Sequence, residues 1–187
     1  MQAESGRWRE AAPGLIDLAS HSTADVYRWL RGAVAALGTS NANAYSELCM
    51  TGRSRFAGSA EAETAWVLFR GLILRPQAED VSHTLPELLR RVEEGQAHSF
   101  TAANLLFLRS EMAYRKGEFE EALRFLDAWA NSIDERPVNI RLLQYTKASA
   151  LPDFWRAMVT CRLGQLEEAR HAYSIGFQKL RAFHAGF

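Results

Sequence analysis

A short pattern that occurs twice constrains the fold of this 187-residue chain more than any other feature. Both copies read Gly, any residue, a large apolar residue, Glu, Glu and Ala, and they begin at Gly117 and Gly164. Glycine lets a helix end in the left-handed backbone region that other residues avoid. The acidic pair would then lie in the first turn of the next helix, where the helix dipole favours negative charge. The pattern therefore predicts two tight turns, each joining two helices.

The other residues of each turn have expected packing roles. The apolar residue two positions after the glycine, Phe119 or Leu166, is expected to fill the corner between the two helices. The small residue three positions further on, Ala122 or Ala169, is expected to let two helices approach closely. With the two glycines, these residues are the predicted structural turns of the chain.

The composition favours helices throughout. The chain has 29 Ala and 22 Leu but only 7 Val and 5 Ile. Ala and Leu lose little side-chain freedom in a helix, whereas β-branched residues fit strands better. No segment alternates apolar and polar residues for long enough to predict a strand. We therefore expect an all-α fold of eight to ten helices, with short loops that make neighbouring helices antiparallel.

Capping residues, glycines and prolines mark the expected helix boundaries. Thr23 is the expected cap of one helix, Asn41 or Asn43 of the next, and Asp80 and Ser82 precede a later one. A short apolar patch at residues 15–20 comes before these helices. The predicted helices cover residues 24–37, 42 or 44 to about 56, 60–74, 81–94, 102–116, 119–133, 138–149, 152–163 and 166 to about 183.

The two turns resemble the turn of a tetratricopeptide repeat (TPR), a helix–turn–helix unit of about 34 residues. In that register the units start near Ala103 and Ala150, with Ser110 and Ala157 at the small helix-crossing position. The resemblance implies a right-handed superhelix of antiparallel helix pairs. It predicts an N-terminal arm with a short helix at residues 1–22 and a TPR-like domain at 23–187. Within that domain, degenerate units occupy 23–98, and clearer units occupy about 103–136 and 150–183.

The upstream half resembles a narrower group. Its sequence is similar to the helical-repeat region that follows the kinase domain in planctomycete-type bacterial serine/threonine kinases. This resemblance, from about Trp29 to Phe177, implies a bacterial signalling context. It does not imply kinase activity, because the chain lacks the Gly-rich, HRD and DFG motifs of kinases. The residues that carry it are Leu37-Gly38, Tyr45, Leu48-Cys49, Arg55-Phe56, Glu63-Thr64-Ala65, Leu72 to Pro76 and Glu79-Asp80.

The charge and hydropathy of the chain indicate which classes of partner to expect and in which cellular compartment. The chain carries 22 basic and 22 acidic residues, which argues against general nucleic-acid binding. Its most apolar stretch, residues 66–74, is too short to cross a membrane and contains Arg70. Cys49 and Cys161 form no CxxC motif and are expected to be reduced core thiols. Without a signal-peptide pattern at the N-terminus, we expect a cytoplasmic protein with no nucleic-acid or membrane partner.

Motifs of catalysis and metal binding are missing from the sequence. The five histidines form neither HxxxH nor HExxH, and no phosphate-binding loop or GxSxG elbow occurs. The Glu-Glu pairs of the two turns are typical of a solvated helix surface rather than of an acid–base pair. We therefore expect no enzymatic activity, no metal and no cofactor.

The TPR resemblance implies a concave groove lined by the first helix of each unit. The Lys and Asn residues with which some TPR domains clamp a terminal carboxylate are replaced here by apolar and acidic residues. Such a groove suits an amphipathic helix or an extended apolar peptide. The alternative is that these side chains pack against a neighbouring helix. The expected groove residues are Asn104, Phe107, Glu111, Tyr114, Leu151, Phe154, Met158 and Cys161.

Two other functions compete with a protein-binding scaffold. A regulatory domain would bind a small ligand, with Trp66, Trp129 and Trp155 as candidate contacts. A self-assembling structural module would bury the apolar C-terminal end, where Phe183 and Phe187 follow Leu180, against a second copy or a further segment. A homodimer through that end is the expectation of this second alternative.

Overall fold

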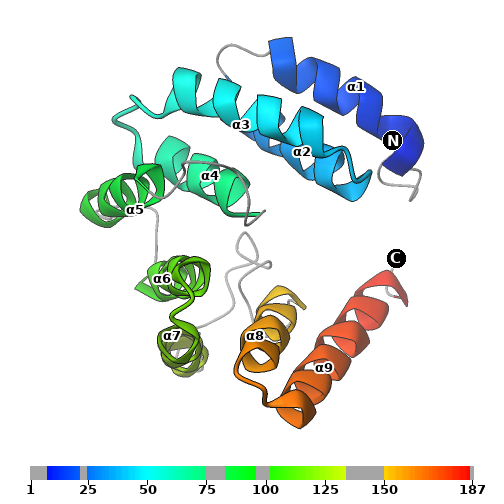
Figure 1. The fold of residues 1–187 in the computed structure, drawn as a ribbon, viewed down its shortest axis with the longest axis vertical. Helices are drawn as coiled ribbons and strands as arrows, with labels where there is room; N and C mark the ends of the chain where they lie inside the picture. The colour runs from blue at the N-terminus through cyan, green and yellow to red at the C-terminus, as the bar shows by residue number, and fades with distance from the viewer. Residues whose placement is uncertain (1–7, 22–24, 75–82, 96–101, 134–149, 186–187) are drawn as a thin grey trace. The chain divides into compact units, whose positions relative to one another are not determined.

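The computed structural model describes residues 8–21, 25–74, 83–95, 102–133 and 150–185 (Figure 1). Every regular element within these ranges is an α-helix. The helices are α1 (Trp8–His21), α2 (Val26–Gly38), α3 (Ala42–Phe56), α4 (Ala62–Ile73), α5 (Thr84–Glu94), α6 (Ala102–Lys116), α7 (Phe119–Ile133), α8 (Leu151–Arg162) and α9 (Leu166–Ala185).

The chain forms two compact units, residues 1–99 and residues 100–187. The first contains α1 to α5 and the second contains α6 to α9. Consecutive helices pack against each other within each unit, most extensively α1 with α2, α4 with α5, α6 with α7 and α8 with α9. The all-α fold class predicted from the sequence is confirmed for the described residues.

The helix bounds agree best with prediction in the second unit. The bounds of α6 and α7 are those expected from the glycine and capping signals. The patch expected at residues 15–20 is instead part of α1, which is 14 residues long and includes Pro13. Ala12 and Ala19, two helical turns apart, are both buried, so packing of one helix face extends α1 beyond the apolar patch.

Side-chain caps fix where α2 and α3 begin. The Asp25 carboxylate accepts the N–H groups of Tyr27 and Arg28, both at 3.0 Å, so α2 begins two residues later than expected. Asn41, one of the two expected caps of α3, accepts the N–H of Ala44 at 3.1 Å. The predicted caps Thr23, Asp80 and Ser82 and the predicted helix 138–149 lie outside the described residues.

The core of the first unit is built around Trp29 of α2. Its ring is fully buried, and its indole N–H donates to the carbonyl oxygen of Leu48 at 2.6 Å. Phe56 packs edge-to-face on it, with ring centroids 6.4 Å apart. Gly52 of α3 and Gly71 of α4 lie so close to the ring that a Cβ at either position would overlap it. Small residues on two helices thus let α3 and α4 close around one tryptophan.

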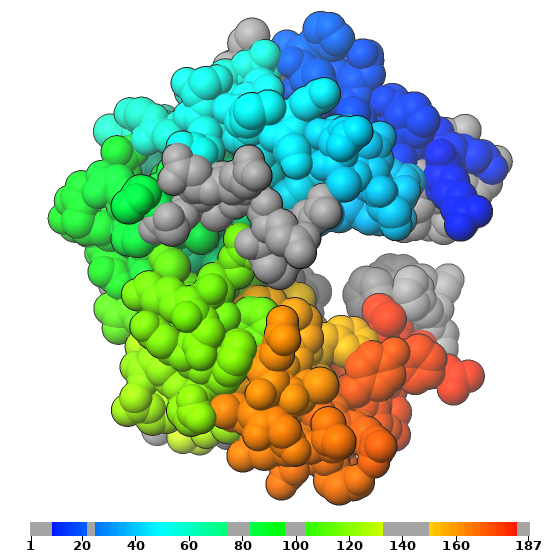
Figure 2. All heavy atoms as spheres, viewed as in Figure 1, coloured from blue at the N-terminus to red at the C-terminus, as the bar shows by residue number. Residues whose placement is uncertain are grey.

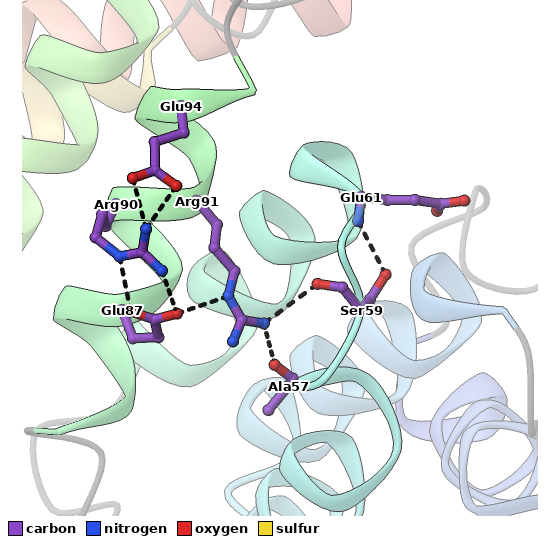
Figure 3. A network of polar contacts seen from close by, with 7 residues as sticks. All are labelled: Ala57, Ser59, Glu61, Glu87, Arg90, Arg91 and Glu94. Carbon is purple, nitrogen blue, oxygen red and sulfur yellow. Dashed lines mark hydrogen bonds and ion pairs between the residues drawn. The ribbon is translucent and has the colours of Figure 1, made fainter.

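An arginine joins α5 to the turn between α3 and α4 (Figure 3). The Arg91 guanidinium donates to the carbonyl oxygens of Ala57 and, at 3.2 Å, Ser59. Glu87 accepts hydrogen bonds from both Arg90 and Arg91, at 2.8–2.9 Å. These bonds stabilise the carboxylate and lower the pKa of Glu87 to about 2. Through this network, Glu87 orients the Arg91 guanidinium towards the carbonyl groups of Ala57 and Ser59.

The two predicted turns have the same backbone geometry. Gly117 and Gly164 have φ of 81° and 76°, and the residues after them donate their N–H groups back into α6 and α8. The N–H of Glu118 bonds the Ala113 carbonyl at 2.9 Å, and that of Gln165 bonds the Thr160 carbonyl at 3.0 Å. A Cβ at either glycine would meet no atom within 4 Å, so the backbone conformation alone requires glycine there.

Candidate functional site

Helix α8 covers one face of α6 through Trp155. The indole N–H of Trp155 donates to the Ser110 hydroxyl at 3.1 Å. Its ring lies 6.3 Å from that of Phe107 and 5.1 Å from that of Tyr114, centroid to centroid. Arg156, the next residue, forms an ion pair of 2.5 Å with Asp127 of α7. The α6–α7 pair therefore holds α8 by an aromatic anchor and a charge pair.

This packing accounts for the predicted groove residues of the first clear TPR-like unit. Asn104, Phe107 and Glu111 are each 3% exposed or less. Phe107 also packs edge-to-face on Trp129 of α7, with centroids 5.8 Å apart. These three side chains lie inside the second compact unit, as the alternative of packing against a neighbouring helix expects. Tyr114, the fourth, is half-buried.

Three of the four predicted groove residues of the next unit lie together with Tyr114 around a cavity of about 810 Å³. Phe154 is half-buried, Met158 is 44% exposed and Cys161 is exposed, while the fourth residue, Leu151, does not line this cavity. We call this cavity the C-terminal groove. Its lining residues are Tyr114, Phe154, Ala157, Met158, Cys161, Arg162, Leu166, Ala169, Arg170 and Tyr173.

Helix α9 forms the second wall of the C-terminal groove. Tyr173 packs on Phe154 with ring centroids 5.4 Å apart and stacks on Phe177 at 6.4 Å. Gly176 brings the two helices together, because a Cβ there would lie only 3.0 Å from the Phe154 ring. In the space-filling view, the orange to red atoms of α8 and α9 form one continuous surface (Figure 2).

The charged side chains that line the C-terminal groove are both arginines. The Arg162 guanidinium lies 3.4 Å from the Tyr114 hydroxyl and 5.9 Å from the centroid of the Phe119 ring. Arg170 forms a 2.5 Å ion pair with Glu167, in which both side chains are more than 70% exposed. No carboxylate is present among the described residues that line the groove. An apolar floor with a cationic rim is the result.

Leu166 lies in a different environment from the helix corner that the turn pattern predicts for it. Phe119, its equivalent, packs on Tyr114 at 5.5 Å and fills the corner as expected. Leu166 is 53% exposed and lines the groove instead, because the position equivalent to Tyr114 holds the smaller Cys161. The expectation of two core thiols is wrong for Cys161, which is exposed, whereas Cys49 is buried.

Sequence reasoning also missed the contribution of α9. Its exposed apolar residues recur at the spacing of one helix face, which is the signal that could have identified a binding surface. They are Leu166, Tyr173, Phe177 and Leu180.

A second pocket, of about 410 Å³, lies among α7, α8 and α9. Lys179 and Asp153 form a 2.7 Å ion pair at its edge, beside Arg156. Trp129 lines it and is 5% exposed, and its indole N–H has no hydrogen-bond partner among the described residues. Of the other two candidate ligand contacts, Trp66 is buried in α4 and Trp155 is occupied in packing on α6.

The described part of the chain has neither a metal-binding cluster nor a membrane-spanning helix. Its His, Cys, Asp and Glu residues form no group of three or more that could hold a metal ion. None of its helices is both long enough and apolar enough to span a bilayer.

Comparison with known proteins finds distant similarity to solved structures and no match of sequence family. No family model and no curated protein sequence matches the chain. It is similar to a solved structure of MamA MSR-1, with 18% identity and a TM-score of 0.44 over 97% of this chain and 91% of that one. It is also similar to one of MamA AMB-1, with 17% identity and a TM-score of 0.45 over 97% of this chain and 94% of that one.

Proposed function

We propose that this protein is a non-catalytic interaction module that binds a polypeptide segment of another protein in the C-terminal groove. One observation carries the proposal: Met158, Leu166 and Tyr173 are 44–57% exposed around a single cavity of about 810 Å³. Large apolar side chains that gather around one concave surface mark binding sites.

The proposed mechanism is complementarity of shape and charge. Burial of the partner's apolar side chains against Phe154, Met158 and Tyr173 supplies affinity, at roughly 25 cal/mol per Å² of apolar surface removed from water. Arg162 and Arg170 at the rim then favour a partner with carboxylates and set its orientation. No covalent chemistry and no cofactor is involved.

The eight residues expected from the sequence divide into two roles in this proposal. Tyr114, Phe154, Met158 and Cys161 contact the partner. The other four support the groove from within the unit; they are Asn104, Phe107, Glu111 and Leu151.

The cellular setting belongs to the proposal as well. We place the module in bacterial signalling, in the cytoplasm, on the strength of the sequence resemblance to the helical region of bacterial kinases. The balanced charge, with 22 basic and 22 acidic residues, supports a protein partner rather than nucleic acid.

The test is selection of binding peptides against the full chain. A library of random 16-residue peptides is selected on the wild-type protein, and each enriched peptide is titrated against two variants. Met158→Glu places a charge in the groove, whereas Met50→Glu makes the same change on α3 at a residue that is 64% exposed. We expect peptides whose affinity falls at least tenfold with Met158→Glu and stays unchanged with Met50→Glu. If every enriched peptide binds both variants as it binds the wild type, the groove is not the binding site.

The 410 Å³ pocket favours a second candidate function, the sensing of a small ligand. Its volume lies in the range of small-molecule sites, and it combines an apolar floor with charged groups. A ligand there would contact Trp129. Titration with a panel of metabolites would then change tryptophan fluorescence saturably, and Trp129→Phe would abolish the change. A response that survives Trp129→Phe would place the ligand elsewhere.

Self-assembly is the remaining alternative, and the exposed Phe177 and Leu180 near the end of α9 favour it. The side chains of Phe183 and Phe187 lie outside the described residues. Under this alternative, sedimentation equilibrium gives a dimer, and Phe177→Ser converts it to a monomer. A wild-type monomer at high concentration excludes it.

A further inference from the structure

The second compact unit contains two copies of the same helix–turn–helix surface, and α8 covers only the first copy. The surface of the α6–α7 pair holds Trp155 of α8 between Phe107, Ser110 and Tyr114. Because Gly117 and Gly164 are 47 positions apart, each residue of this surface has an equivalent 47 positions later. The equivalents of the three contact residues are Phe154, Ala157 and Cys161, and all three line the C-terminal groove.

The exposed fractions of equivalent residues show that no described helix covers the second copy. Leu126 of α7 is 1% exposed, whereas its equivalent in α9, Tyr173, is 57% exposed. Glu111 of α6 is 3% exposed, whereas its equivalent in α8, Met158, is 44% exposed. The α8–α9 pair therefore presents the surface on which a helix packs in the preceding pair, but without a helix on it among the described residues.

We infer that the occupant of the C-terminal groove is an α-helix of a partner protein, placed on α8 and α9 as α8 is placed on α6 and α7. This inference rests on the proposed function and specifies the partner. The helix carries an aromatic anchor at the position of Trp155 and apolar residues on the same face.

One difference in sequence between the two copies indicates which aromatic residue the partner helix uses as its anchor. Ser110 accepts the indole N–H of Trp155, but its equivalent is Ala157, which has no side-chain acceptor. An indole buried there would leave its N–H without that bond, and an unpaired buried donor is costly. The groove therefore selects phenylalanine over tryptophan as the anchor.

Two further differences in sequence between the copies indicate the charge that the partner helix carries at the position of Arg156. In the first copy, Arg156 of α8 pairs with Asp127 of α7. The equivalent of Asp127 is Ser174, which carries no charge, and one helical turn earlier Arg170 replaces Leu123. Residues four apart lie on the same face of a helix, so Arg170 lies near the point that the residue in place of Arg156 would reach. Its ion pair with Glu167 is solvent-exposed and therefore weak, so a partner carboxylate can compete for it. The partner helix therefore carries Glu or Asp there.

The test uses synthetic helical peptides with the sequence of residues 150–163, in which Cys161 is replaced by Ser. The parent peptide keeps Trp155 and Arg156, the designed peptide carries Trp155→Phe and Arg156→Glu, and a third carries Trp155→Ala and Arg156→Glu. Binding of dye-labelled peptide to the full chain is measured by fluorescence anisotropy, and helix formation by the circular dichroism difference spectrum. We expect the designed peptide to gain helix on binding and to bind about tenfold more tightly than the other two.

A charge-reversal variant distinguishes the proposed placement of the peptide on α8 and α9 from non-specific binding. Arg170→Glu should reverse the order, so that a Trp155→Phe peptide that keeps Arg156 binds more tightly than the designed peptide. Arg124→Glu makes the same change on α7, outside the residues that line the groove, and should leave the order unchanged. The inference is overturned if the designed peptide shows no preference over the parent, or if Arg170→Glu leaves the preference intact.

The result of the library selection distinguishes the proposed peptide-binding function of the groove from the inferred partner helix. Peptides that depend on Met158 but bind in an extended form, without an aromatic anchor, support the proposed groove and contradict the partner helix. An absence of any peptide that depends on Met158 contradicts both.

Discussion

The two turn glycines show, at the scale of single residues, which positions a sequence reveals directly. Gly117 and Gly164 have positive φ, and neither has a neighbour that a Cβ would touch. The requirement is therefore local, and a sequence pattern of six residues contains it. The contacts of Arg91 are different, because they are made to backbone carbonyl groups more than thirty positions away. Any residue type provides such a carbonyl, so no pattern of side chains predicts them.

Gly117→Ala should destabilise the second unit by about 1–2 kcal/mol, because an L-residue with a side chain pays that cost in the left-handed region. Urea unfolding followed by circular dichroism measures the change. Gly14→Ala is the matched control: Gly14 lies within α1 with open space around it, so the same substitution should stabilise the protein by roughly 0.5–1 kcal/mol. Equal effects of the two substitutions would contradict a conformational role for Gly117.

Glu87 should contribute to stability in a pH-dependent way. Its folded pKa is lowered from 4.5 to about 2 by hydrogen bonds from Arg90 and Arg91. For a carboxyl group with a lowered pKa, the contribution is full above the unfolded pKa and is lost as the pH falls towards the folded one. The stability difference between wild type and Glu87→Gln should therefore shrink between pH 4.5 and pH 2. Glu47→Gln, on α3, is the control, and an equal pH dependence for it would contradict this role.

At the scale of helices, packing around Trp29 decides how closely α2, α3 and α4 approach. Gly71→Ala should destabilise the first unit by about 1–3 kcal/mol, because the added Cβ would overlap the Trp29 ring and force the helices apart. Gly58→Ala, where the added Cβ would meet nothing within 4 Å, should have little effect. Thermal unfolding of the two variants measures the difference, and a Gly71→Ala protein as stable as Gly58→Ala would show that the contact is not tight.

Helix positions followed from the sequence where local signals were unambiguous. The bounds of α6 and α7 were predictable because a glycine and an acidic first turn mark the junction between them. The start of α2 was predicted wrongly, because Thr23 was the expected cap, whereas Asp25, the better capping residue of the two, begins the helix. Burial was harder still: Phe107 and Phe154 occupy equivalent positions, yet only Phe107 is fully buried. That difference arises because α8 packs on the α6–α7 pair, and a repeat pattern does not show which pair another helix covers.

At the scale of the whole molecule, the two compact units should respond separately to substitutions. Gly71→Ala lies in the first unit and Gly117→Ala in the second. Residue-resolved hydrogen exchange on each variant should show lost protection in the unit that carries the substitution, with the other unit unchanged. Loss of protection throughout the chain from either substitution would contradict two separately stabilised units.

The binding account at this scale depends on the C-terminal groove, and the chain contains a natural probe of it. Cys161 is exposed and lines the groove, whereas Cys49 is buried at 4% exposure. In the free protein, iodoacetamide should therefore alkylate Cys161 quickly and Cys49 slowly, and Cys49 provides an internal control for unfolding.

The most direct test of the groove is the alkylation rate of Cys161, followed by mass spectrometry while the designed phenylalanine–glutamate peptide is added to the full chain. A helix bound on α8 and α9 excludes the reagent, so the rate should fall at least tenfold at saturation, with the midpoint at the dissociation constant from anisotropy. The rate at Cys49 should stay constant. A peptide that binds while Cys161 reacts at its original rate would contradict the account.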